Sequence, residues 1–401
     1  MTRLRRLIAT ALVDSFGLSL GWTVFSLHVT RGHGLAGLGL CNAAMLVGVA
    51  LSAPAAARLS TRLDGRALLR ATAAAEAVLR VGTFALLLAG APLAAVAVAV
   101  AASNVVAWTG YAGMRAEVAA ADPRGAAMTW YMVAVAAIEA AGTATAAMLP
   151  TGARGLVSGG LLVAVVAGYG ACLFPTWLVA GGARVVRASP PPRVAGLLRG
   201  AGLLRGPRPG PQAGLLASGG LVMLLGSGPT LLAVGLAAQL HGTRWVAGSA
   251  LAFAAGSLLA PLAVVRLERR AVPPPIAWPA LGVGMVAGWS FAAWYPAALL
   301  AAQVLSGMCM SALEGDMDAR VAAAGDASLR GVTAGLASAA ALRAFGSAAA
   351  VALTPRLVSD SGVGALSVAL VTVLLIAMVV TLAWHRSRSA LAGSGPAVHP
   401  G

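Results

Sequence analysis

The chain has 401 residues, of which 59% are hydrophobic and 10% are charged, and its mean hydropathy is +0.86. A soluble globule of this size needs more polar surface than this composition supplies, so we expect a polytopic membrane protein. The formal net charge of +16 does not indicate a nucleic-acid partner. The arginines cluster between apolar runs and lack interleaved aromatic residues that would stack on bases.

Several kinds of chemistry are excluded by the residues that are missing or scattered. The sequence has no lysine, so neither a phosphate-binding P-loop lysine nor a Schiff base can form on this chain. Cys41, Cys172 and Cys309 stand singly within apolar segments, a spacing that fits neither a disulfide framework nor a zinc site. No His, Asp and Cys constellation indicates nucleophilic or metal chemistry. We therefore expect no enzyme activity, no cofactor and no metal.

Twelve apolar runs are long enough to cross a hydrocarbon layer of roughly 30 Å as helices. The first run has a basic start but is long, is interrupted by Asp14 and has no clear cleavage site, so it predicts a transmembrane helix and not a removed signal peptide. The predicted spans are Leu7–Val29, Ala36–Ala57, Ala67–Gly90, Leu93–Met114, Ala126–Leu149, Gly155–Ala180, Ala213–Leu240, Trp245–Val265, Ile276–Tyr295, Ala297–Leu313, Gly331–Leu353 and Val363–Trp384.

The stretch 181–212 is the long break in this pattern. It contains six prolines and six arginines, a composition typical of a solvated linker. Within it Val194, Leu197, Leu198 and Leu204 recur at helical spacing, which leaves open a helix on an anionic lipid surface. The predicted organisation is therefore a six-helix bundle (1–180), a basic cytoplasmic linker (181–212), a second six-helix bundle (213–384) and a disordered polar tail (385–401).

The arginines are distributed unevenly among the predicted loops. With the N-terminus in the cytoplasm, 22 of the 28 arginines fall in cytoplasmic segments, and only Arg31, Arg154, Arg244 and Arg356 fall in outer loops. Such an excess of positive charge is typical of the cytoplasmic side of a membrane protein. We predict a multi-pass protein of the cell membrane with both termini in the cytoplasm.

The two halves of the chain repeat one another. Three segments of the first half match segments of the second half at an offset of 203 or 204 residues, each in an equivalent topological position. The matching pairs are Met114–Ala121 with Met317–Ala324, Arg62–Arg66 with Arg266–Arg270, and Glu139–Gly142 with Arg343–Gly346. With six spans in each half, both halves enter the membrane in the same orientation.

The loop after the second span resembles the signature loop of the major facilitator superfamily of secondary transporters, Gly-x-x-x-Asp-Arg-x-Gly-Arg-Arg. In Ala57–Arg66 (ARLSTRLDGR), Arg62 and Arg66 keep basic positions, whereas Thr61 stands where the aspartate belongs and Asp64 where a glycine does. The six-plus-six spans and the basic central loop extend this resemblance over nearly the whole chain.

The resemblance implies an all-α protein in which twelve transmembrane helices form two six-helix bundles related by a pseudo-two-fold axis along the membrane normal. It also implies a cavity lined by the first, fourth, seventh and tenth spans, and a gate of charged residues on the cytoplasmic side. The residues at the gate positions are Arg62, Asp64, Arg66, Arg115, Glu117, Arg266, Glu268, Asp318 and Arg320.

Two motifs within the spans bear on function. Asp14-Ser-Phe-Gly17 is similar to an Asp-x-x-Gly found in relatives that include drug exporters, whereas Gly142 is followed by Thr143 and so departs from the Gly-Pro of the antiporter branch. We expect a secondary transporter that exports a drug-like or amphipathic small molecule, with protons as the coupling ion. An importer, and a non-transporting membrane partner or sensor with the same fold, are the alternatives. Beyond its substrate and the lipid bilayer, we expect no partner and a monomer.

Apart from Arg70 near the start of the third span, five charges lie inside the predicted spans: Asp14, Glu76, Arg80, Glu139 and Arg343. Each costs roughly 2.5–3.5 kcal/mol at the bilayer centre on insertion scales and so needs a partner, a cavity or a neutral form. Glu76 and Arg80 are four residues apart, glutamate first, which predicts a structural ion pair within one helix. Asp14 has no such partner on its own helix. We expect it to bind a proton or a substrate cation, with a hydrogen bond to a neighbouring helix as the alternative.

Glu139 and Arg343 occupy equivalent positions of the repeat and carry opposite charge. We expect both to point inward at one depth, where they bridge through water or hold the two ends of a zwitterionic substrate. The alternative is that each is satisfied within its own half. Glu314, Asp316 and Asp318 close the tenth span near cytoplasmic arginines, and we expect gate or surface salt bridges there.

Overall fold

The computed structural model describes residues 3–121, 126–153, 155–183, 211–324 and 329–393. These residues form helices joined by turns, and no strand occurs among them. The predicted all-α class is therefore confirmed for the described part of the chain. Seven helical segments within it are long and apolar enough to cross a membrane. The count of twelve spans and the division into two six-helix bundles stay predictions.

In the first half the helices are α1 (Arg3–Ser60), α2 (Gly65–Leu88), α3 (Leu93–Ala121), α4 (Ala126–Met148), α5 (Gly159–Ala171), α6 (Phe174–Val179) and η1 (Ala180–Gly182). In the second half they are α8 (Pro211–Gly226), α9 (Gly228–Leu231), α10 (Ala233–His241), α11 (Arg244–Arg269), α12 (Pro274–Ala287), η3 (Gly288–Ser290), α13 (Pro296–Ala324) and α14 (Leu329–Gly393).

The first and the last helix each contain one sharp bend at a glycine. Gly34 in α1 has φ 67° and Gly362 in α14 has φ 78°. Glycine reaches this left-handed region without the steric cost that a Cβ imposes. Each long helix is thus two arms, and each arm is long enough to span a bilayer. Gly34 and Gly362 lie where the sequence predicts turns between successive spans.

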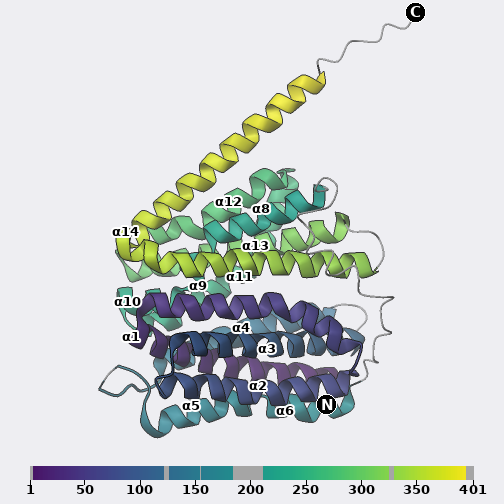
Figure 1. Cartoon of the computed structure of the whole chain (residues 1–401). Coiled ribbons are helices and arrows are strands. Elements are labelled where there is room, and N and C mark those ends of the chain that lie inside the picture. The colour runs from purple at the N-terminus through teal and green to yellow at the C-terminus, as the bar shows by residue number, and fades with distance from the viewer. Residues whose placement is uncertain (1–2, 122–125, 154, 184–210, 325–328, 394–401) are drawn as a thin grey trace, which may run out of the picture.

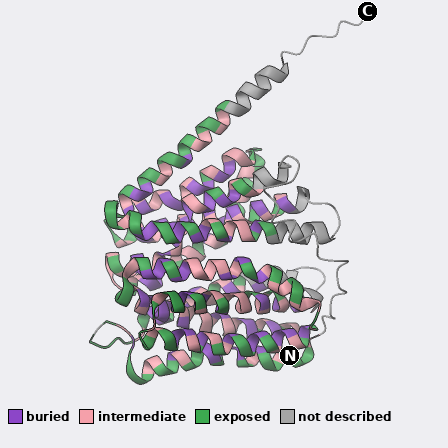
Figure 2. Cartoon of the chain, viewed as in Figure 1, coloured by how far each residue is buried: buried purple, intermediate pink, exposed green. Residues whose placement is uncertain are grey.

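The helices of the two halves lie on opposite sides of the molecule (Figure 1). Helices α1 to α6 occupy one side, whereas α8 and α11 to α14 occupy the other. Contacts between the halves come from α1 against α14 and α10, and from α4 against α11. The second arm of α14 runs obliquely away from the other helices (Figure 1). Buried positions form stripes on the faces that meet neighbouring helices, and exposed positions cover the outer faces (Figure 2).

We name the two ends of the molecule by their landmarks. The Gly34 end holds the bends of α1 and α14, beside which Val29, Leu38 and Val363 share one buried cluster. The linker end is the opposite end, where η1 ends and α8 begins (Figure 1). The proposed lipid-surface helix of the linker lies outside the described residues. The disordered tail expected from His385 is wrong in part, because α14 continues to Gly393. Ser387–Ala392 contains no proline and includes good helix formers, so the last helix can extend.

Small residues let these helices approach closely, as is usual in membranes. A Cβ added at Gly307 of α13 would collide with the carbonyl oxygen of Phe253 in α11. A Cβ added at Gly315 in the same helix would meet nothing within 4 Å. The two glycines are therefore a matched pair for testing the packing of α11 on α13.

We expect Gly307→Ala to lower the free energy of unfolding by about 1–3 kcal/mol, the usual cost of overpacking. Gly315→Ala should leave it unchanged or raise it by up to about 1 kcal/mol, because alanine favours helix. Unfolding of the purified chain in mixed micelles measures both. Equal effects of the two substitutions would contradict the close approach.

Candidate functional site

The guanidinium of Arg80 is the centre of a buried charge cluster in the first half. Arg80 lies in α2 with 2% of its side chain exposed. Its Nη2 is 2.9 Å from Oδ1 of Asp14 in α1 and also pairs with Oε1 of Glu76, one turn earlier in α2. One cation is thus shared by two carboxylates from two helices.

The end of α5 and the residue after it supply further contacts of Arg80. Its Nη1 donates to the carbonyl oxygen of Tyr169 at 3.3 Å and lies 3.2 Å from Sγ of Cys172. The guanidinium carbon also lies 5.2 Å from the centre of the Tyr169 ring, within range of a cation–π interaction. Arg80 therefore connects α1, α2 and the end of α5.

Asp14 has no partner on its own helix, as expected, but it pairs with Arg80 of the neighbouring helix α2. Arg80 is long enough to reach Asp14 across the interface between α1 and α2, and sequence spacing cannot show a contact between helices. Cys172 and Tyr169 were also missed. Gly17 of Asp14-Ser-Phe-Gly17 makes room for Cys172, because a Cβ at Gly17 would lie 2.5 Å from this residue, but this contact is visible only in the structure. Whether Asp14 binds a proton or a cation stays a prediction.

Glu139 of α4 lies on the same side of the first half. It is close enough to interact electrostatically with Asp14, Tyr111 and Tyr131. Arg115 of α3 stacks over the Tyr111 ring, with 5.8 Å between the guanidinium carbon and the ring centre. Among the described residues no ion pair joins Glu139 to Arg115 or to any other cation. Glu139 is therefore the carboxylate in this region that is held without a direct counter-ion.

Arg343 of α14 is satisfied within the second half. Its two terminal nitrogens donate to Oδ1 and Oδ2 of Asp318 in α13 at 2.5 and 3.3 Å. Glu314, one turn earlier, is close enough to interact electrostatically with Arg343. The expected bridge between Arg343 and Glu139 is therefore wrong in this structure. Arg343 finds a local carboxylate, which is the alternative left open by the sequence.

The other charged residues at the predicted gate positions take separate partners. Glu117, fully buried at the end of α3, pairs with Arg3 at the start of α1. Nε of Arg320 donates to Oδ2 of Asp316 at 2.7 Å, and the same oxygen accepts from Nε1 of Trp278 at 2.7 Å.

The signature loop itself makes a helix cap. Oδ1 of Asp64 accepts from the backbone nitrogen of Ala67 at 2.7 Å and so caps α2, a role that favours an acidic residue at this position. The side chains of Arg62, Arg66, Arg266 and Glu268 are exposed. Within the described residues none of these four forms an ion pair with the opposite half.

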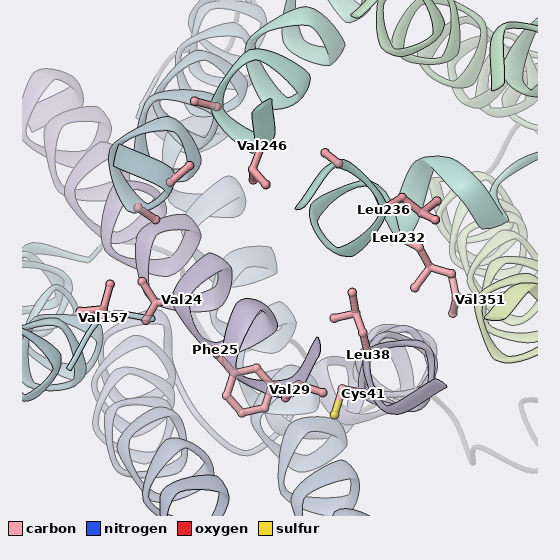
Figure 3. Packing of buried hydrophobic residues seen from close by; sticks show 14 of the residues in the cluster. Val24, Phe25, Val29, Leu38, Cys41, Val157, Leu232, Leu236, Val246 and Val351 are labelled. Carbon is pink, nitrogen blue, oxygen red and sulfur yellow. The ribbon is translucent and has the colours of Figure 1, made fainter. Parts of the chain in front are cut away.

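At the Gly34 end, one apolar cluster joins the two halves. Its members include Phe25 and Leu38 of α1, Leu236 of α10 and Val351 of α14, all at most 1% exposed (Figure 3). Beside them Nδ2 of Asn42 donates to the carbonyl oxygen of Leu231 at 2.8 Å, and this hydrogen bond also crosses between the halves. The Gly34 end is therefore closed by packed side chains from both halves.

Toward the linker end the buried apolar residues separate into clusters that each belong to one half. One includes Leu7, Leu69 and Val118 of the first half, and another includes Trp278 and Leu313 of the second half. No buried apolar cluster of the described residues joins the halves at this end. The packing is thus asymmetric along the length of the helices.

Two double-mutant cycles share Arg343→Gln and test which carboxylate it depends on. We expect Arg343→Gln and Asp318→Asn to be coupled by about 0.5–3 kcal/mol in the free energy of unfolding, because the side chains are in contact. Arg343→Gln and Glu139→Gln should be additive within about 0.5 kcal/mol, as for separated sites. Unfolding in mixed micelles measures both cycles. Coupling to Glu139 without coupling to Asp318 would contradict the structure.

No protein-family profile matches the chain, and no curated protein sequence matches it. Solved structures do match in fold. The nucleoside transporter NupG (D323A mutant) has a TM-score of 0.71 at 9% identity, with 95% of this chain and 99% of that chain covered. A D-xylose-proton symporter has a TM-score of 0.66 at 13% identity, with 94% and 96% covered.

A bacterial homologue of the iron transporter ferroportin matches in two states. The inward-facing state has a TM-score of 0.61 at 16% identity, with 95% of this chain and 98% of that chain covered. The outward-facing state has a TM-score of 0.56 at 16% identity, with 96% and 100% covered. At these identities the likeness concerns the fold alone, and it confirms the resemblance drawn from the sequence at that level: this chain has a fold of the major facilitator type.

Proposed function

We propose that the protein is a secondary transporter that moves a small molecule across the cytoplasmic membrane by alternating access. In this proposal twelve spans form two six-helix bundles, both termini are cytoplasmic, and the Gly34 end faces outward. The substrate leaves the cell and is a drug-like or amphipathic molecule, with protons as the coupling ion. The fold supports a transport function, because the solved structures similar to it are transporters of nucleosides, D-xylose and iron.

The observation that carries the proposal is the asymmetry of packing between the halves. A single buried cluster joins them at the Gly34 end, whereas each half has its own cluster toward the linker end. In alternating access a site between two bundles is closed at one end and opened at the other. The arginine distribution assigns the closed end to the outside, so this arrangement fits a state that faces the cytoplasm.

The comparison with two states of one relative supports the same assignment. The ferroportin homologue matches this chain with the higher TM-score in its inward-facing state, 0.61 against 0.56 in its outward-facing state. A moving closure at the Gly34 end needs weak interactions that can be exchanged. The cluster there is made of aliphatic and aromatic contacts, with the hydrogen bond of Asn42 across the halves beside it. Among the described residues no ion pair joins the halves there, so none must break for this end to open.

A disulfide across the Gly34 end tests alternating access directly. An ideal Cβ at Gly235 of α10 lies 2.7 Å from Cδ2 of Leu38 in α1, so cysteines at these positions are near bonding range once the leucine is shortened. In a background with alanine at Cys41, Cys172 and Cys309, we expect oxidation of Leu38→Cys/Gly235→Cys to abolish flux and reduction to restore it. The two single-cysteine variants are the controls. Full flux through the oxidised, crosslinked protein would contradict the mechanism.

Reconstituted vesicles test transport itself. The full chain should move at least one compound from a panel of amphipathic organic cations, nucleosides, pentoses and Fe²⁺, and an imposed pH gradient should change the rate. The crosslinked variant provides the background signal on the same membranes. The direction of the pH gradient that drives accumulation of the compound inside the vesicles distinguishes export from import. No flux above that background for any compound under either gradient would favour the alternative, a membrane partner or sensor with this fold.

A further inference from the structure

A small cavity lies in the first half, and every residue that lines it belongs to that half. It has a volume of about 30 Å³ and is lined by residues of α1, α2, α3, α4 and the segment 173–176. A water molecule needs about 10–15 Å³ on this measure. The cavity therefore has room for one small ion or about two waters, and not for an organic substrate.

Two carboxylates face this cavity, and each has an oxygen that Arg80 does not use. Arg80 pairs with Oδ1 of Asp14 and Oε1 of Glu76. Oε2 of Glu76 lies 4.0 Å from the ideal Cβ position at Gly110, a residue of the cavity wall. Because Gly110 has no side chain, the space in front of this oxygen stays open.

A buried hydroxyl without a partner points to a ligand in the cavity. Thr176 lines it and is 7% exposed, and its Oγ1 has no hydrogen-bond partner among the residues that the structure describes. A buried polar atom left unpaired costs roughly 1–3 kcal/mol, so a bound species that satisfies it is expected. Oγ1 of Thr72, also on the wall, donates to the carbonyl oxygen of Leu68 at 2.9 Å and keeps lone pairs for a cation.

The balance of charge sets the charge of that species. When Asp14 and Glu76 are both ionised, they bring two negative charges to the single positive charge of Arg80, and the cluster is one positive charge short. Glu139 of α4 is close enough to Asp14 to interact with it electrostatically. Oxygen ligands of this kind suit hard cations, and a single charge completes neutrality.

We propose that this cavity binds one monovalent cation, a proton or a sodium ion, between the free oxygens of Asp14 and Glu76 and the hydroxyl of Thr176. A proton would sit on one of the two carboxylates and donate to Oγ1 of Thr176, whereas a sodium ion would accept lone pairs from all three groups. Its role as the coupling ion rests on the proposed transport function, but its binding does not. The titratable and charged groups around the site are Asp14 from α1, Glu76 and Arg80 from α2, Tyr111 from α3, Tyr131 and Glu139 from α4, and Tyr169 and Cys172 from α5 and the residue after it.

The chain offers a matched control for the key hydroxyl. Thr83 of α2 is also 7% exposed and its Oγ1 is likewise unpaired in the part of the chain that the structure describes, but it does not line this cavity. Thr176→Val and Thr83→Val therefore remove the same atom from two equally buried sites. Gly110→Ala is a second variant that keeps every charge, since its Cβ would lie 2.9 Å from Oγ1 of Thr72 and fill the space.

The experiment measures thermal unfolding of the full chain in nanodiscs, without any transport. In one arm sodium replaces choline at constant ionic strength and pH; in the other, pH is varied in choline alone. For a sodium site, the melting temperature should rise and saturate with sodium, and Thr176→Val and Gly110→Ala should each weaken the apparent affinity at least tenfold. Thr83→Val should match the wild type.

For a proton site, sodium should have no effect on the melting temperature. The midpoint of the pH-dependent change in melting temperature should move by at least half a pH unit in Thr176→Val and in Gly110→Ala, but not in Thr83→Val. Either pattern supports the cavity site and identifies its ion. If neither variant differs from Thr83→Val in either arm, the proposal is overturned. That outcome would not contradict the transport function. Conversely, if the protein binds the cation but shows no flux in vesicles, only the transport function is rejected.

Discussion

The structure of the first half depends on one buried cation. Arg80 has almost no contact with solvent, and in an apolar helix bundle its charge is tolerable only if other groups surround it. Asp14, Glu76, Tyr169 and Cys172 do so from three segments of the chain. This requirement fixes how α1, α2 and α5 face one another. It also leaves an excess carboxylate charge beside a small cavity, which is why that cavity is a candidate for a coupling ion.

In the second half, other residues compensate the buried charges. Positions that hold Arg115 and Glu139 in the first half correspond to Asp318 and Arg343 in the second. Asp318 and Arg343 bind each other. Arg115 lies instead over the ring of Tyr111, and Glu139 has no counter-ion among the described residues. The two halves thus differ in the charges that they leave without a counter-ion among the described residues. The proposed cation site lies in the first half.

The sequence predicts what depends on spacing along the chain. The apolar runs and the arginine bias are local or cumulative properties, and the turns at Gly34 and Gly362 and the proximity of Glu76 to Arg80 follow from them. Contacts between helices could not be predicted from the sequence. The ion pairs of Arg80 with Asp14 and of Arg343 with Asp318 depend on how helices rotate against each other, and the repeat suggested the wrong partner for Arg343. Nothing in the sequence indicated Thr176 as a site residue, because a hydroxyl without a hydrogen-bond partner can be recognised only when its surroundings are known.

The central claim is that the halves are fixed together at the Gly34 end and separate at the linker end in one state of a cycle. Distances between spin labels test it most directly, with cysteines at the exposed positions Arg66 of α2 and Arg269 of α11 in a background without native cysteines. We expect at least two populations of the distance between the labels at the linker end. After the Gly34 end is crosslinked, only the population with the longer distance should remain. A single distance that is the same with and without the crosslink would contradict it.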